Sequence, residues 1–139
     1  MKLRIGAAII ALTCAPSIVP VAAHHSVSAT FDVTREVTIR GAVTSVEWTN
    51  PHARFWVDAR NADGTVSNWE LELAPPNALR RSIGLDFVKP GDQVIVDLWQ
   101  AKDGSRLANT LTLTTVPDGR VFNFSRDTTT SWETTASRK

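Results

Sequence analysis

Apolar and polar residues alternate along most of the chain from residue 36 onward, which is the pattern of half-buried β-strands. The first segment, residues 36–48, keeps its apolar residues on one phase up to Val43 and on the opposite phase from Val46. This change of phase near Thr44-Ser45 predicts a bulge or a sharp bend in a long first strand. Asn50-Pro51 then ends the segment.

Two further strands are predicted at residues 53–60 and 68–73, joined by a turn at Asn61–Gly64. An Asp-Gly pair is typical of a hairpin turn, because glycine readily takes up a positive φ. Apolar side chains alternate with polar ones in both strands. The expected inward residues are Ala53, Phe55, Val57 and Ala59 in the second strand, and Trp69, Leu71 and Leu73 in the third.

A short helix is predicted after the third strand. Pro75-Pro76 ends that strand, and residues 77–83 follow with Leu79 and Ile83 four positions apart. This spacing gives the segment one apolar stripe of the kind that a helix packs against a core. Gly84 is expected to end the helix.

The predicted order of elements indicates an all-β domain with one short helix, spanning residues 24–124. Two strands are expected after the helix, at residues 93–99 and 107–113, and a last hairpin turn leads into residues 121–124. Three strands, a helix and two strands close most simply as a small five-stranded OB-like Greek-key barrel, with the helix between strands 3 and 4. An immunoglobulin-like sandwich is the alternative, but it needs seven strands.

The N-terminus has the parts of a secretory signal peptide. Lys2 and Arg4 form a positive region, a short apolar run follows, and Val21-Ala22-Ala23 places small residues before a cleavage point at His24. We therefore expect residues 1–23 to be removed on export. The mature protein is expected to be periplasmic or secreted.

Export changes the charge balance of the chain. The 139 residues include 15 basic and 14 acidic ones; without residues 1–23 the chain has 116 residues, 13 of them basic, and a net charge of −1. A nucleic-acid partner is therefore disfavoured, because such domains carry a basic excess. Cys14 would leave with the signal peptide, and no later apolar run is long enough to span a bilayer. Residues 125–139, rich in Ser and Thr, are expected to form a disordered polar tail.

Five short runs of the mature sequence are distinctive: His24-His25-Ser26, Glu47-Trp48-Thr49-Asn50-Pro51-His52-Ala53, Asn77-Ala78-Leu79, Lys89-Pro90-Gly91-Asp92 and Pro117-Asp118-Gly119-Arg120. Through these runs the chain resembles an exported bacterial family, the domain of unknown function 6152, over about residues 24–124. The Trp-Thr-Asn-Pro-His run is fairly specific. The resemblance implies export and a small β-rich domain, and it carries no established activity.

The three histidines form the first candidate site. His24 would stand at the mature N-terminus, where its α-amine and imidazole together can chelate copper. His25 or His52 would add a further nitrogen, and His52 lies in the loop between the first two strands, which OB folds use for ligands. Either His24, His25 and His52 hold copper, or the first two form a plain terminus and His52 orients the Asn50-Pro51 turn.

The outer surface of the predicted barrel forms a second candidate site. In an OB fold, the loop between strands 4 and 5 lies near the loop between strands 1 and 2, and a cleft between them holds ligands. Such a cleft would take a peptide, a sugar or a partner protein. The alternative is that the aromatic residues are half-buried strand residues and the charges form a solvated face. The candidate ligand-binding residues are Trp48, Asn50, Trp56, Lys102 and Arg106.

No catalytic constellation is evident, since no serine lies in a Gly-x-Ser-x-Gly turn. The sequence therefore predicts an exported, periplasmic, non-enzymatic binding or accessory module. It would take an unidentified small ligand or protein partner on the loop face around His52. The alternative is a copper-binding carrier or scavenger that uses His24, His25 and His52.

Overall fold

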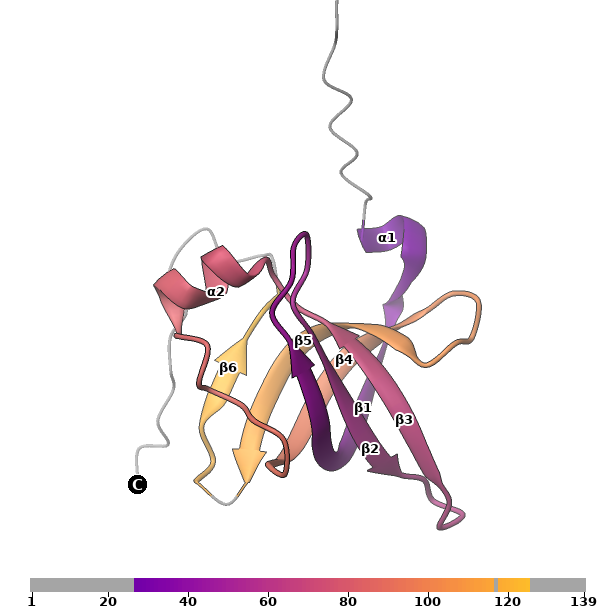
Figure 1. Cartoon of the computed structure of the whole chain (residues 1–139). Coiled ribbons are helices and arrows are strands. Elements are labelled where there is room, and N and C mark those ends of the chain that lie inside the picture. The colour runs from indigo at the N-terminus through magenta and orange to yellow at the C-terminus, as the bar shows by residue number, and fades with distance from the viewer. Residues whose placement is uncertain (1–26, 117, 126–139) are drawn as a thin grey trace, which may run out of the picture.

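The structure, a computed structural model, describes residues 27–116 and 118–125 (Figure 1). The expected signal peptide, His24, His25 and the expected tail from residue 126 onward lie outside the described residues. The described residues thus cover nearly all of the predicted barrel domain. Its strands and helices come in nearly the order that the sequence pattern predicts.

Six strands and two short helices make up the described residues. In chain order they are α1 (Val27–Thr30), β1 (Phe31–Glu47), β2 (Arg54–Arg60), β3 (Val66–Glu72), α2 (Pro76–Ser82), β4 (Gln93–Ala101), β5 (Leu107–Val116) and β6 (Val121–Asn123). The predicted order of three strands, a helix and two strands is therefore confirmed. A short helix precedes it and a short sixth strand follows it.

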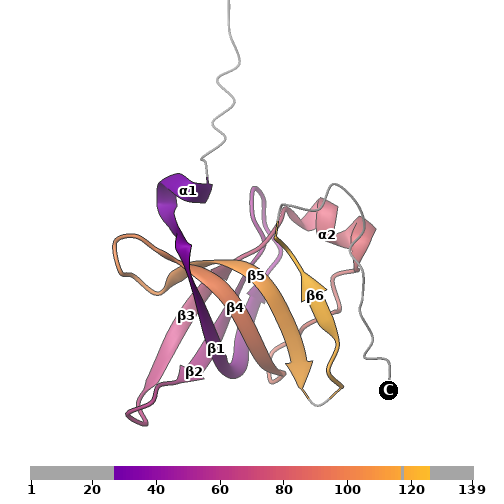
Figure 2. The ribbon, with the colours of Figure 1, turned by 180° about the vertical axis from the view of Figure 1, so that it is seen from behind.

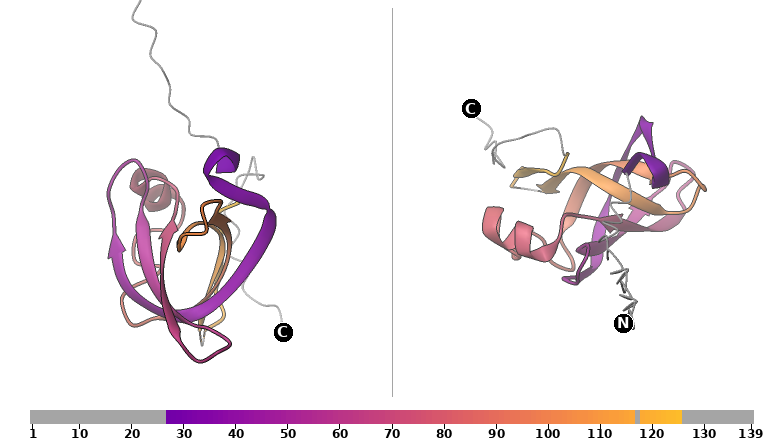
Figure 3. Two further views of the ribbon diagram at one scale, coloured as in Figure 1. Left: turned by 90° about the vertical axis from the view of Figure 1, so that its right-hand side faces the viewer. Right: turned by 90° about the horizontal axis from the view of Figure 1, so that it is seen from above.

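The first five strands close into a barrel. The sheet order is β3-β2-β1-β4-β5-β6, and β3 also pairs in parallel with β5, from Glu70 opposite Leu107 to Glu72 opposite Asn109. The closed circuit β1-β2-β3-β5-β4-β1 is the predicted OB-like barrel. Along the chain α2 follows β3 and precedes β4, as expected. Seen from above, it lies to one side of the barrel (Figure 3).

The short strand β6 widens the sheet beside the barrel. It pairs with the second half of β5, from Thr112 opposite Asn123 to Thr114 opposite Val121, whereas β3 pairs with the first half of β5. One edge of β5 thus serves two different strands. In Figures 1 and 2, β6 and α2 lie together on the same side of the barrel.

The long strand β1 begins earlier than its alternation indicates. It starts at Phe31, which is buried opposite Ala101, but Val33 is exposed and the pairing with β4 shifts between Phe31 and Glu36. The irregular register hides this part of the strand from a period-two pattern. The predicted bulge is confirmed, because the pairing with β2 shifts between Val43 and Ser45.

Aromatic side chains fill the end of the barrel next to α2. Phe87, in the segment after α2, has its ring centroid 5.8 Å from Trp48, 5.1 Å from Phe122 and 5.9 Å from Phe124. Leu79 of α2 is fully buried against the same core.

The inward residues predicted for the second and third strands are all buried: Ala53, Phe55, Val57, Ala59, Trp69, Leu71 and Leu73.

At Gly41 the backbones of β1 and β2 leave no room for a side chain. A Cβ atom at this position would lie 2.1 Å from the Asp58 carbonyl oxygen and 2.9 Å from the Ala59 Cα. Only a residue without a side chain allows this contact. Gly41 is also the first residue of β1 that pairs with β2, so the two strands separate on its N-terminal side.

We predict that Gly41→Ala destabilises the protein strongly. The added methyl group would force the backbones of β1 and β2 apart, which lowers the free energy of unfolding by about 2–3 kcal/mol. Gly104→Ala is the matched control, because Gly104 has a φ of +79° and nothing within 4 Å of an added Cβ. That change is expected to cost only about 1 kcal/mol. Urea unfolding measures both, and equal losses would contradict the role assigned to Gly41.

Candidate functional site

The predicted site residues before β2 lie toward the α2 end of the barrel. The Nδ1 atom of His52 lies 3.0 Å from the carbonyl oxygen of Leu73, just after β3. Because a carbonyl only accepts, Nδ1 carries a proton in this contact, and in the neutral ring the lone pair is then on Nε2. Trp48 packs edge-on against Phe87, and Asn50 is exposed before a cis peptide bond to Pro51.

Trp56 lies on the outer face of the barrel, as predicted, and is half-buried there. On the same face, Arg54 forms ion pairs with Glu70 at 3.3 Å and with Glu72 at 3.4 Å. Across the β2–β3 pairing, Glu70 lies opposite Trp56 and Glu72 lies opposite Arg54. The charges on this face are thus largely paired with one another.

Lys102 and Arg106 lie at the other end of the barrel from α2. The Lys102 Nζ donates to the carbonyl oxygen of Ser28 at 2.6 Å, which fastens α1 to the β4–β5 loop. The Arg106 guanidinium lies 5.0 Å above the ring of buried Trp69. No described contact joins these two residues to His52 or Trp48, so the structure divides the predicted ligand-binding residues into two groups.

A cleft opens where β1 and β2 separate. Its lining residues come from the first half of β1, the end of β2 and the turn after it, β3, the end of β4 and the residue before β5. In Figure 1 the β2–β3 hairpin lies on the side of the barrel away from α2. Four arginines line it, with buried Trp69 beneath them: Arg35, Arg40, Arg60 and Arg106. We call this depression the arginine cleft.

The arginine cleft is strongly positive. All four of its arginines are exposed, and none has an ion pair with a carboxylate within residues 27–116 and 118–125. No Asp or Glu is among the residues that line it. Asp58 lines an adjoining outer depression that Arg40 and Arg60 line as well, and its carboxylate there accepts from the Asn68 amide at 2.7 Å. Hydrogen bonds from Thr34 and, more weakly, the charge of nearby Arg35 lower the pKa of the Asp32 carboxyl, but none of the four guanidinium groups forms a direct ion pair in the described structure.

Two side-chain amides hold the loops that flank the arginine cleft. Asn61 donates to the hydroxyls of Thr65 and Ser67, each at 2.8 Å, across the β2–β3 hairpin. Gln100 donates to the carbonyl oxygens of Gly104 and Ser105 at 3.1 and 2.8 Å, across the β4–β5 loop. Both amides also line the arginine cleft, so hydrogen bonds within the protein hold the conformation of its two flanking loops.

Sequence reasoning found only Arg106 among the four arginines of the arginine cleft. Arg35, Arg40 and Arg60 lie in β1 and at the end of β2, where each looks like an ordinary surface charge. Their convergence depends on the crossing of β1 and β2 at Gly41, which alternation does not reveal. A glycine inside a predicted strand, next to an arginine, is the one available signal, because it marks close approach of another backbone.

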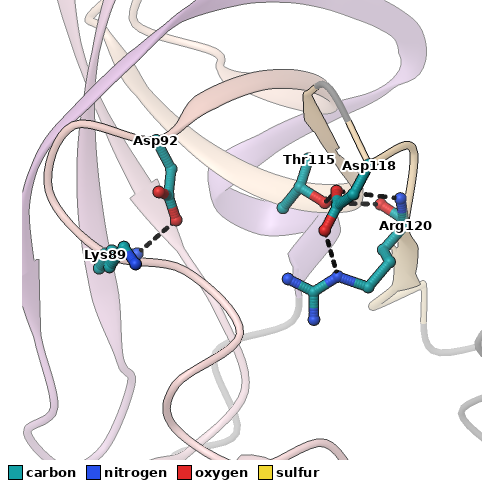
Figure 4. Close-up of polar contacts among 5 residues, drawn as sticks. All are labelled: Lys89, Asp92, Thr115, Asp118 and Arg120. Carbon is teal, nitrogen blue, oxygen red and sulfur yellow. Dashed lines mark hydrogen bonds and ion pairs between the residues drawn. The ribbon is translucent and has the colours of Figure 1, made fainter.

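Four aspartates of the described residues accept hydrogen bonds from residues two or three positions away in the sequence. Thr34 beside Asp32, Thr65 beside Asp63 and Ser105 beside Asp103 donate to these carboxylates, which lowers the pKa of each below its ordinary value of 3.8. Asp118 accepts from the Thr115 hydroxyl and from the Arg120 Nε, the latter at 2.7 Å (Figure 4). These two donors, in that order, lower the pKa of Asp118 as well.

The described residues contain neither a group of three or more metal-ligating His, Cys, Asp or Glu side chains nor a helix that could cross a membrane. Among them, His52 has no second histidine beside it. The predicted copper ligands His24 and His25 lie outside the described residues. The copper site therefore stays a prediction.

Fold and cleft together define a small OB-like barrel with a braced, positively charged depression at one end. The chain belongs to a family of unknown function, DUF6152, whose model matches residues 11–110. This confirms the resemblance to that family, and four of the five distinctive runs lie within the matched residues, whereas residues 117–120 lie beyond them. No curated protein and no solved structure matches the chain.

We predict that the turn between β5 and β6 loosens in acid. The pKa of Asp118 is lower in the folded chain than its ordinary 3.8, so the carboxylate stabilises the fold above that pH and ceases to do so as the pH falls below it. Asp118→Asn should lower the melting temperature at pH 7 and have little effect near about pH 2. Asp86→Asn, at an exposed position without a hydrogen bond in the described structure, is the control. A loss for Asp118→Asn that is the same at both pH values would contradict this assignment.

Proposed function

We propose that this protein is an exported, non-enzymatic binding module that holds an anionic ligand in the arginine cleft. The observation that supports this is the gathering of four exposed arginines, without carboxylate partners in the described structure, around one depression. Guanidinium groups bind carboxylate, sulfate and phosphate through two parallel hydrogen bonds. The signal-peptide pattern of residues 1–23 supports a periplasmic or secreted location.

Mutual repulsion within the arginine cleft strengthens the proposal. Four like charges around one concave surface produce a positive potential there, although the mature chain as predicted carries a net charge of −1. An anionic ligand would relieve this repulsion and gain charge-assisted hydrogen bonds. Asn61 and Gln100 already hold the two flanking loops, which lowers the entropy lost on binding.

Binding of polyanions by the mature protein tests the proposal. The probes are polyglutamate, polyphosphate and a sulfated polysaccharide, each labelled and followed by fluorescence anisotropy. We expect at least one to bind, more weakly as salt is added, because exposed charges are screened. The double variant Arg60→Gln, Arg106→Gln should bind at least tenfold more weakly, since two charge-assisted contacts are lost.

Arg80→Gln, Arg81→Gln is the matched control for this experiment. These two arginines are exposed on α2, at the other end of the barrel, and the change removes the same charge. Affinity in this variant should stay close to that of the unchanged protein. Equal losses in the two double variants, or no binding of any polyanion, would overturn the proposal.

The geometry of His52 favours a second candidate function, a copper carrier or scavenger. We propose it because Nδ1 is fixed by the Leu73 carbonyl, which leaves Nε2 free to ligate. Metal-binding histidines usually donate their other ring N–H to such an acceptor. The other ligands would be His24, with its α-amine at the mature N-terminus, and His25.

We predict that His52→Ala separates the two roles of this histidine. Loss of the hydrogen bond to Leu73 should cost about 1 kcal/mol in unfolding free energy. If His52 is also a ligand, copper titrated into the mature protein should bind at least tenfold more weakly in the variant. In a matched control the α-amine of His24 is acetylated, which keeps all three imidazoles and removes the amine as a ligand. Unchanged copper affinity in both proteins would exclude this copper site.

A further inference from the structure

Beside the arginine cleft, one edge of β1 pairs with no strand among residues 27–116 and 118–125. Residues 36–42 of β1 pair with β4, whereas pairing with β2 begins only at Gly41. The N-terminal half of β1 therefore has a strand on one edge and none on the other, within the described part of the chain. A free strand edge presents backbone donors and acceptors to which another chain can add.

The hydrogen bonds of Val43 show which residues face that free edge. Its N–H donates to the Asp92 carbonyl at 2.9 Å, and its carbonyl accepts from Gly91 at 2.8 Å, both in the turn that leads into β4. Successive residues of a strand direct their backbone groups to opposite edges. Since 36–42 pair with β4 in continuous register, Thr38 and Arg40 direct theirs toward the arginine cleft.

The β2–β3 hairpin leaves room along this edge. β2 follows β1 as far as Ala59 opposite Gly41, and beyond that point the two strands have no further pairing. Residues 37–40 and 59–62 instead form opposite walls of the arginine cleft. An incoming strand along the edge of β1 would thus continue the line of β2.

The charges around this edge select the side chains of an incoming strand. Such a strand directs alternate side chains to its two faces. Arg35 and Arg106 would meet one set near Trp69, and Arg40 and Arg60 would meet the other. Between Phe31 and Glu47, β1 contains only two acidic residues, Asp32 and Glu36, and both precede residue 37. Acidic side chains of an incoming strand therefore fit best beside residues 37–40.

We propose that the arginine cleft takes an extended acidic segment of a partner polypeptide, which adds as a strand to the free edge of β1. The inference rests on the proposed function and specifies the ligand. A polypeptide is favoured over a polysaccharide because only a polypeptide supplies backbone donors and acceptors at the strand repeat that the edge presents. A second copy of β1 is disfavoured, since Arg35 and Arg40 would face their own equivalents.

Three glutamate hexapeptides of equal charge test this proposal on the mature protein. One is unmodified, one is N-methylated at every second residue, and one is N-methylated at every residue. Alternate methylation leaves one edge of an extended peptide able to donate, whereas full methylation removes every N–H. We expect the first two to bind with similar affinity and the third at least tenfold more weakly, because it loses backbone hydrogen bonds to β1.

Hydrogen exchange provides a second readout on β1 itself. The amides of Thr38 and Arg40 should become protected when the unmodified peptide binds. The N–H groups of Val37 and Ile39 point toward β4, so the exchange rates of these two amides should change little. A change at Thr38 and Arg40 that is absent with the fully methylated peptide is the signature of strand addition.

The outcomes separate this inference from the function on which it rests. Equal affinity for the unmodified and the fully methylated peptide overturns strand addition and leaves an anion-binding cleft. Binding of the sulfated polysaccharide but of no peptide also overturns it and assigns the cleft to a glycan. If no polyanion binds at all, the proposed function fails as well.

Discussion

The close contact between β1 and β2 at Gly41 is the constraint on which the rest of the structure depends. Because no side chain separates the strands there, β1 can curve across the barrel and pair with β4 along one part and with β2 along another. On the N-terminal side of Gly41 the two strands no longer pair. Gly41 thus lies at the boundary between the paired part of β1 and β2 and the opening at one end of the barrel.

Alternation along the chain predicted the barrel because inward and outward positions differ consistently in β2 and β3, where Phe55 and Trp69 face the core. It also located the bulge at Thr44-Ser45, since a bulge shifts the phase. The start of β1 was missed, because exposed Val33 and an irregular register break the period there. The helix α1 has a single turn and no buried residue, so it leaves no periodic signal.

The candidate site was less predictable than the fold. The loop arrangement of an OB fold suggested one cleft that joins His52 to Arg106. In the structure, His52 bonds to Leu73 near α2, whereas Arg106 stacks on Trp69 at the other end of the barrel. Which loops come together depends on strand curvature, and a one-dimensional pattern does not encode it. Arg35 and Arg60 are 25 positions apart in sequence and line the same depression only because of that curvature.

The parallel pairing of β3 with β5 also governs when the barrel can form. Glu70–Glu72 must find Leu107–Asn109, so ring closure involves contacts between distant parts of the chain, which are slow to form. Synthesis supplies β5 after the four other barrel strands, and until it arrives both β3 and β4 have an open edge. The growing chain is thus most prone to wrong association before β5 has been made, and β5 is the strand that ends this exposure.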